Sequence, residues 1–357
     1  MKVIFDIQHL YYLPQYLPVI DALKAHNTGI ELVGYKTDDE DLNRIIESAL
    51  NETQLTIKIV HNWQDALAHY LAQKADWLVF GNAVADLEQL HTVSKTVLMQ
   101  HGVGPKSCYY DVSKNPTTVR FVEGEKRLSN LQAMFPNGNF VDSGYAKLDP
   151  AINRTSTKRT LASLGLDESK PILLYAPTFY PSSIELFAKS FPSDFENYNI
   201  ILKPHFFSLT KPRYKKQKAL LENWAKQDNV YLAGVDEFNL LEFMAISDVM
   251  LSDASSAIFE FAALDKPVIW CDFYKLRWSY RGIFSYRFKK RIDESIEVFH
   301  QLCERAENYK ALTQCVKNAV DNSKAKQNIR AQVTEEYVGK VDGQCAKRIV
   351  DYLLKHS

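Results

Sequence analysis

The sequence of 357 residues lacks the cysteine patterns that mark disulfide-rich and zinc-binding proteins. Its cysteines number five, which is odd, and none of them stands in a C-x-x-C pair. This arrangement argues against a disulfide framework and against a zinc knuckle. It predicts reduced thiols in a cytoplasmic protein.

Net charge and long apolar runs are also missing. Lys+Arg and Asp+Glu are 43 each, so the chain has no surplus of cations for a phosphate backbone, and we expect no nucleic-acid partner. No stretch approaches the roughly 18 apolar residues of a membrane-spanning helix. The first apolar run contains Asp6, which predicts a buried strand rather than a signal peptide. Any membrane contact should be peripheral, at the inner face of the cell membrane.

Several catalytic and cofactor motifs are absent as well. The sequence has no P-loop, no G-x-G-x-x-G after its first strand, no G-x-S-x-G and no H-E-x-x-H. The nine histidines are scattered along the chain. We therefore expect neither a metal site nor a bound cofactor.

Short apolar runs alternate with amphipathic stretches, which predicts an α/β protein with parallel sheets. At roughly 100–200 residues per domain, the length suggests two domains. The polar stretch 146–169 lacks a strand pattern and separates the predicted domains 1–150 and 151–357, the second with a helical tail from 296 to 356. We expect the ligand in a crevice at the carboxyl ends of the strands, as in a GT-B-type transferase. The predicted strands are 2–6, 30–35, 56–60, 77–80, 96–99, 119–122 and 140–142, followed by 172–175, 200–203, 230–232, 248–251 and 268–271.

Two histidines directly follow predicted strands. His101 lies in QHGVG after the strand that ends at Met99, and an imidazole there could accept the proton of an acceptor hydroxyl. His205 lies in LKPH, where it or Lys203 could neutralise a phosphate. A histidine held within a tight loop, and a solvated surface loop, remain equally good explanations of the two motifs.

The segment LSDASSAIFE combines a strand end with a helix start. Asp253, Ser255 and Ser256 would surround free backbone N–H groups that suit phosphate oxygens, and Glu260, one turn later, could bind ribose hydroxyls. Plain helix capping explains one of these polar residues but not all of them. Thr178, after the strand 172–175, is a further candidate for phosphate contact.

The stretch 274–291 interleaves cations with aromatic residues. Arg277, Arg281 and Arg287 could meet an anionic acceptor or the cytoplasmic leaflet of the membrane. A partly packed loop with solvated cations is the simpler explanation.

Taken in order, these segments resemble the CDP-glycerol glycerophosphotransferase family, which makes teichoic acids and related capsule polymers. The resemblance runs from about residue 96 to the C-terminus. Asp-x-Ser-Ser followed by a Lys-Pro strand is its most specific part. The matching segments are QHGVG, SGYAKLD, LYAPTF, LKPH, LSDASSAIFEFAALDKPVIW and DGQCAKRIVDYL.

The resemblance implies a GT-B fold and a function. The expected donor is CDP-glycerol or a similar CDP-polyol, the acceptor is a lipid- or glycan-linked saccharide, and CMP is released. His101 and His205 would be the catalytic histidines, with Asp253, Ser255 and Ser256 at the donor. His101-Gly102-Val103 replaces the family's usual H-G-T, and Ala254 replaces a usual Tyr, which leaves the polyol open. A GT-B enzyme that uses a UDP-linked sugar, or a crevice that only binds a ligand, remain alternatives.

Overall fold

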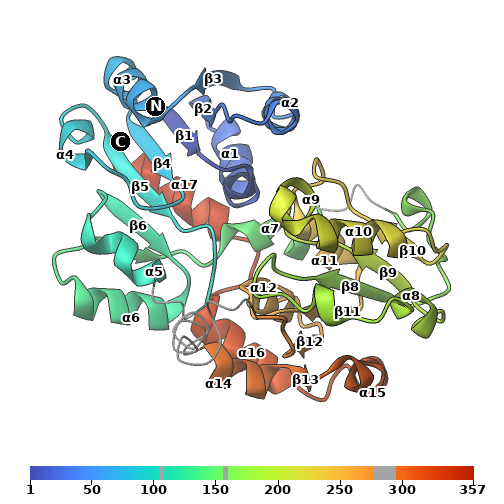
Figure 1. The fold of residues 1–357 in the computed structure, drawn as a ribbon. Coiled ribbons are helices and arrows are strands. Elements are labelled where there is room, and N and C mark those ends of the chain that lie inside the picture. Colours follow the sequence, from blue (N-terminus) through green and yellow to red (C-terminus); the bar gives the residue numbers. More distant parts are fainter. Residues whose placement is uncertain (105–107, 156–159, 277–294) are drawn as a thin grey trace. The chain divides into compact units, whose positions relative to one another are not determined.

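The computed structural model describes residues 1–104, 108–155, 160–276 and 295–357. The chain divides into two compact units (Figure 1). Unit 1 contains Met1–Val103, Ser107–Asn153 and Glu335–Ser357, and unit 2 contains Gly104–Lys106 and Arg154–Thr334. Glu335–Ser357 belong to unit 1, although the sequence pattern placed them in the second domain.

Unit 1 is built on a seven-stranded parallel sheet with the order β3-β2-β1-β4-β5-β6-β7. Successive side chains of each strand point to opposite faces of the sheet. In β1, Ile4 packs into the core with α3 and α4, whereas the ring of Phe5 lies 5.2 Å from that of Tyr16 in α1. The strands are β1 Lys2–Ile7, β2 Gly29–Tyr35, β3 Thr56–Val60, β4 Trp77–Phe80, β5 Lys95–Met99, β6 Val119–Val122 and β7 Phe140–Asp142. The helices are α1 Leu13–Lys24, α2 Glu40–Asn51, α3 Trp63–Gln73, α4 Leu87–Leu90, α5 Cys108–Asp111, α6 Gly124–Met134, α7 Asp149–Ile152 and α17 Cys345–Lys355.

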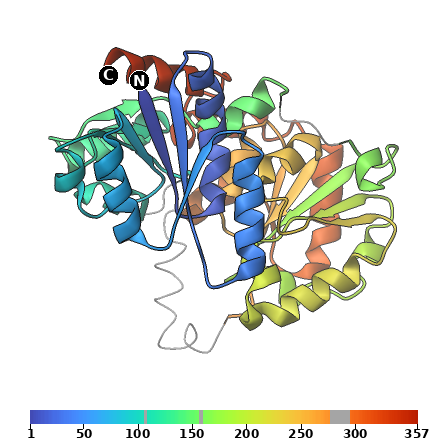
Figure 2. The ribbon, with the colours of Figure 1, turned by 90° about the horizontal axis from the view of Figure 1, so that it is seen from above.

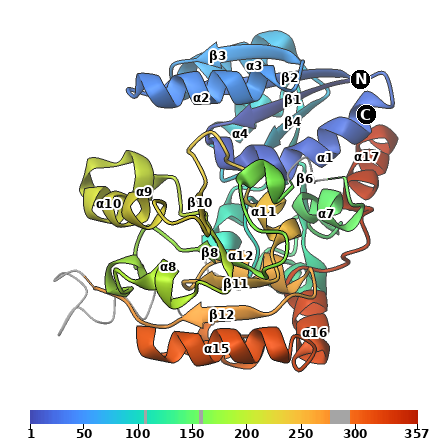
Figure 3. The ribbon, with the colours of Figure 1, turned by 90° about the vertical axis from the view of Figure 1, so that its right-hand side faces the viewer.

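Unit 2 repeats this plan on a six-stranded parallel sheet with the order β10-β9-β8-β11-β12-β13. One hydrophobic core of this unit is rich in aromatic residues and includes Phe187, Phe191 and Trp224. The long helix α15 runs beside β12 and β13 (Figure 3). The strands are β8 Ile172–Ala176, β9 Asn199–Leu202, β10 Val230–Leu232, β11 Val249–Ser252, β12 Val268–Cys271 and β13 Glu304–Ala306. The helices are α8 Phe191–Asp194, α9 Phe207–Thr210, α10 Lys215–Trp224, α11 Leu240–Ile246, α12 Ala257–Ala262, α14 Ser295–Leu302, α15 Tyr309–Asp321 and α16 Gln327–Tyr337.

Side-chain caps explain where several helices begin. Asp39, Asn62, Asn239 and Asn308 each precede a helix and accept a hydrogen bond from a backbone N–H of its first turn. Lys266 caps the opposite end of α11, because its ammonium group donates to the carbonyls of Met244, Ala245 and Ser247 at 2.7–2.9 Å.

The C-terminal segment returns to unit 1 and brings the two chain ends together (Figure 2). The hydroxyl of Ser357 lies 2.8 Å from the sulfur of Met1, and α17 packs against α1. The pattern of residues 296–356 predicts an almost wholly helical tail. The tail is mostly helical, but the strand β13 interrupts it. Glu304-Arg305-Ala306 carries no strand-like alternation, and only its pairing with β12, at the edge of the sheet, makes it a strand.

Candidate functional site

The sequence-predicted residues gather at the carboxyl ends of neighbouring strands in each unit. In unit 2, Thr178, His205 and Asp253 follow β8, β9 and β11, which are adjacent in the sheet. Parallel strands lie about 4.8 Å apart, so these loops share one edge. The strand order reverses between β8 and β11, which is where open α/β sheets bind ligands. In unit 1, His101 follows β5, one strand from the corresponding reversal between β1 and β4.

The imidazole of His101 has a defined tautomer. Its Nδ1 lies 3.0 Å from the carbonyl oxygen of Gly81, which can only accept a hydrogen bond. In the neutral ring the proton is therefore on Nδ1, and Nε2 carries the lone pair. The side-chain amide of Gln100 is 3.3 Å from Nδ1, and this tautomer requires its oxygen rather than its nitrogen to face the ring. A half-buried histidine in this form is suited to accept a proton.

Aromatic side chains fix the plane of the His101 ring. Tyr12 stacks on it with centroids 5.0 Å apart, while Tyr11 and Tyr109 approach its edges at 5.1 and 6.2 Å. The hydroxyl of Tyr145 donates to the His101 carbonyl at 2.9 Å. The sequence gives no sign that these four tyrosines surround His101, although Tyr145 belongs to the matching segment SGYAKLD.

His205 has the opposite tautomer. Its Nδ1 accepts the backbone N–H of Phe207 at 3.2 Å, so in the neutral ring the proton is on Nε2. Phe179, Phe206 and Phe207 surround the ring at centroid distances of 4.7–5.0 Å. Burial, with a smaller contribution from the charge of Lys203, lowers the pKa of His205 to about 4. At neutral pH it is thus an uncharged hydrogen-bond donor.

Asp253 is turned into the protein and holds the loop after β8. Its carboxylate accepts the backbone N–H of Thr178 at 3.0 Å and both the N–H and the hydroxyl of Ser183, at 3.1 and 2.5 Å. The hydroxyl of Thr178 donates to the carbonyl of Pro181. Both side chains, expected at the donor, therefore make internal contacts that shape the loop 177–183.

The burial of Asp253 makes stability depend on pH. Desolvation raises its pKa from 3.8 to about 7, so the folded state holds this proton more tightly than the unfolded chain does. The contribution of the protonated Asp253 carboxyl to the free energy of unfolding is complete below pH 4. It is lost as the pH rises from 4 to 7, by up to about 4 kcal/mol. Relative to Asp253→Asn, the wild-type free energy of unfolding should fall over that range in urea titrations. If the free energies of unfolding of wild type and Asp253→Asn differed by the same amount from pH 4 to 7.5, the raised pKa of Asp253 would be contradicted.

The serines at the start of α12 remain exposed to some degree. The Ser255 and Ser252 hydroxyls are 3.1 Å apart, and Ser256 precedes α12 without a side-chain cap. Plain capping therefore does not account for Ser256. Glu260 is 3% exposed and Lys203 is 8% exposed, so both are largely inside unit 2. Arg277, Arg281 and Arg287 lie outside the described residues.

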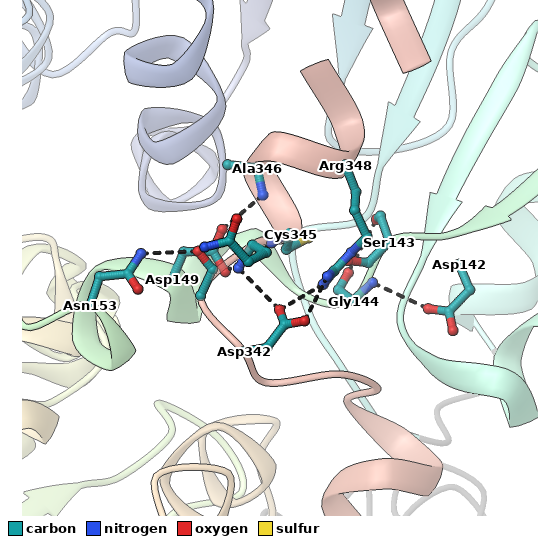
Figure 4. Close-up of polar contacts among 11 residues, drawn as sticks. Asp142, Ser143, Gly144, Asp149, Asn153, Asp342, Cys345, Ala346 and Arg348 are labelled. Atoms are coloured by element: carbon teal, nitrogen blue, oxygen red, sulfur yellow. Dashed lines mark hydrogen bonds and ion pairs between the residues drawn. The ribbon is translucent and has the colours of Figure 1, made fainter. Parts of the chain in front are cut away.

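Two of the matching segments meet each other in unit 1 (Figure 4). The carboxylate of Asp149 accepts the N–H groups of Cys345 and Ala346, at 3.3 and 2.7 Å, and so caps α17. Arg348 forms a two-pronged ion pair with Asp342 and donates to the carbonyl of Ser143. SGYAKLD and DGQCAKRIVDYL are thus joined by structural contacts, and the role of Asp149 as a helix cap could not be read from the sequence.

Comparisons with known proteins agree with this arrangement. The family model described as CDP-Glycerol:Poly(glycerophosphate) glycerophosphotransferase matches residues 66–355. The chain belongs to this glycerophosphotransferase family. It is 35% identical over 156 residues to a teichoic acid glycerol-phosphate primase of Bacillus spizizenii, a match that covers 42% of this chain and 39% of the primase. The chain therefore aligns with well under two thirds of that relative.

Solved structures of low sequence identity share the fold. A His-to-Asn variant of the wall teichoic acid polymerase TagF superposes with a TM-score of 0.68 at 13% identity, covering 99% of this chain and 88% of that one. A putative UDP-N-acetylglucosamine 2-epimerase from Listeria monocytogenes gives 0.64 at 14% identity, covering 99% and 96%. Solved forms of TagF include a His-to-Asn variant, a His-to-Ala variant and a variant soaked with CDPG. The chain thus has a GT-B-type fold.

The described part of the chain contains no helix that is both long and apolar enough to cross a membrane. Within the same residues, no three histidine, cysteine, aspartate or glutamate side chains are grouped so as to hold a metal ion. Four cysteines, Cys271, Cys303, Cys315 and Cys345, are buried as free thiols.

Proposed function

We propose that this chain transfers glycerol phosphate, or a related polyol phosphate, from CDP-glycerol to a hydroxyl of a saccharide acceptor and releases CMP. The product belongs to the synthesis of a cell-surface polymer, teichoic acid or capsule. Membership of the glycerophosphotransferase family is the observation on which this proposal rests. The acceptor saccharide, linked to a lipid or to a glycan, is part of the same proposal.

The tautomers of the two histidines support complementary roles in such a transfer. The Nε2 lone pair of His101 would take the proton of the acceptor hydroxyl. That oxygen then attacks the β-phosphorus, the bond from this phosphorus to the bridging oxygen breaks, and CMP leaves with that oxygen. The Nε2–H of neutral His205 would donate to a phosphate oxygen, and Lys203 would offset the accumulating negative charge.

The variants of TagF add support for this pair. The two histidines replaced in its solved variants are separated by as many positions as His101 and His205 are here. We infer that His101 and His205 correspond to them. Ser255 and Ser256 would contact the donor directly. Asp253 and Glu260, which are buried, and Thr178, whose hydroxyl donates to the carbonyl of Pro181, would position the surrounding loops.

A donor-binding panel tests the proposal. Thermal shifts measured with CDP-glycerol, CDP-ribitol, UDP-sugars and CMP-sugars should show stabilisation by the CDP-polyols alone. At a ligand concentration of 100 times Kd, the expected stabilisation is about 2.7 kcal/mol. The fold shared with a UDP-N-acetylglucosamine 2-epimerase keeps a UDP-linked donor as the second candidate. Stabilisation by UDP-sugars only would favour that candidate and reject CDP-glycerol.

Peripheral contact with the inner face of the membrane is also proposed, since a lipid-linked acceptor would lie there. The expected segment 274–291 is mostly outside the described residues, but unit 2 offers a second basic surface. Five exposed cations follow one another closely in its sequence, and within the described structure only Lys218 is paired, with the carboxylate of Glu222 at 3.8 Å: Lys211, Arg213, Lys215, Lys216 and Lys218. Each could contribute about 1 kcal/mol at an anionic bilayer. Co-sedimentation with phosphatidylglycerol but not phosphatidylcholine vesicles is expected, and its loss should follow replacement of these five by Gln.

A further inference from the structure

An exposed pair of aromatic rings lies beside His101. His9 and Tyr11, in the segment that follows β1, stack with centroids 5.0 Å apart and planes 16° from parallel. Tyr11 is 36% exposed, and its ring approaches that of His101 at 5.1 Å. The stack therefore presents aromatic surface to solvent next to the proposed general base.

Packing against His101 and Tyr12 accounts for only part of the surface of this pair. Tyr12, the next residue, is 1% exposed and already covers the face of His101, and Tyr16 is completely buried. Tyr11 and His9 are instead on the outside of the same turn. Large apolar side chains with this much exposure are few in the described chain, the others being Met134, Leu186 and Leu354.

His9 and Tyr11 lie where open α/β sheets usually bind their ligands. It follows β1, at the reversal of strand order between β1 and β4. The family match begins only at residue 66, so this segment lies outside the matched region. The family model does not describe this segment. Such a segment could recognise the acceptor, which is the substrate that differs from one relative to another.

The chemistry of the pair fits the face of a sugar ring. The C–H groups on one side of a pyranose are apolar and pack on aromatic rings, while its hydroxyls point outward to polar partners. The described partners of Tyr11 are His9, Tyr12 and His101, with no lysine or arginine among them. Burial lowers the pKa of His9, which favours its neutral ring. An acceptor that ends in glycerol phosphate would call for a cation here.

We propose that His9 and Tyr11 form an acceptor platform, which stacks on the terminal pyranose of a saccharide acceptor and holds one of its hydroxyls beside His101. This inference rests on the proposed function and names the acceptor class for the same site: a sugar ring rather than a glycerol phosphate end. Tyr11 acts as a specificity-determining residue, and the aromatic ring rather than the phenol hydroxyl provides the contact.

The kinetic test uses the full chain, CDP-glycerol and a panel of octyl glycosides of hexoses and N-acetylhexosamines, as mono- and disaccharides. Tyr11→Ala should raise the KM for the accepted glycoside about tenfold, as expected for a lost stacking contact, and leave the KM for CDP-glycerol within about twofold. Tyr11→Phe should behave like wild type. Met134→Ala, a similarly exposed apolar residue of unit 1, is the matched control and should change neither constant. An unchanged acceptor KM in Tyr11→Ala, or equal losses in Tyr11→Phe and Tyr11→Ala, would overturn the platform.

A binding experiment separates failure of the platform from failure of the proposed function. Saturation-transfer NMR detects glycoside binding without turnover. If wild type binds a glycoside and Tyr11→Ala does not, the platform stands even if CDP-glycerol proves to be the wrong donor. If wild type binds no glycoside but binds an oligomer of glycerol phosphate, the platform is wrong while glycerophosphotransfer can still be correct.

Discussion

Replacing His101 with Ala should lower kcat by about 10³-fold, within the range that general acid–base catalysis contributes. The reason is the tautomer set by the Gly81 carbonyl, which leaves Nε2 as the only ring nitrogen able to accept a proton. The loss should appear in CMP release with CDP-glycerol and a saccharide acceptor. CDP-glycerol binding should change little, because this role concerns the acceptor hydroxyl.

His101→Asn separates proton transfer from positioning. An asparagine amide can still donate to the Gly81 carbonyl, but it cannot accept a proton at neutral pH. We therefore expect His101→Asn to be as inactive as His101→Ala while unfolding at the wild-type temperature. His26→Ala removes an exposed histidine of the same unit and should be fully active. Activity near wild type in either His101 variant would remove His101 from the mechanism.

His205→Ala should lower kcat by about 10²-fold, similar to the loss of one oxyanion-hole donor. With a pKa of about 4, His205 is neutral at working pH and contributes a hydrogen bond rather than a positive charge. His205→Asn should keep part of the activity, because its amide N–H can also donate. Steady-state rates of CMP release measure both variants, with His300→Ala, at an exposed position of unit 2, as the control.

The pH profile provides a second check on His205. If the residue were a cation in the reaction, wild-type activity would be lost as the pH rises through its pKa. Because that pKa is about 4, no such loss should occur between pH 5 and 8. His205→Asn should keep the pH profile of wild type in this range. A different profile for its residual activity would indicate that His205 titrates during the reaction.

Much of the fold could be predicted from the sequence because buried parallel strands are short apolar runs with clear ends. The strands Thr56–Val60, Trp77–Phe80 and Val119–Val122 occur where the pattern placed them. β13 could not be predicted, since three polar-flanked residues become a strand only through their neighbour β12. The return of α17 to unit 1 is set by tertiary contacts such as Asp149 with Ala346, which no local pattern contains.

The candidate site was predictable only in part. Motifs at strand ends pointed to His101 and His205, because parallel topology places such residues at one edge of a sheet. Their tautomers depend on Gly81 and Phe207 and required coordinates. For Asp253 the sequence pattern was misleading. Its polar neighbours in the sequence suggested a contact with the donor, but its carboxylate accepts hydrogen bonds from Thr178 and Ser183 inside unit 2.

Identification of the products formed from CDP-glycerol and a saccharide acceptor tests the central claim most directly. Chromatography with mass detection should show one CMP for each acceptor whose mass has increased by a glycerol phosphate, and neither product in His101→Ala. Release of CDP, or turnover of a UDP-sugar with no reaction of CDP-glycerol, would contradict the proposal that this chain transfers a polyol phosphate.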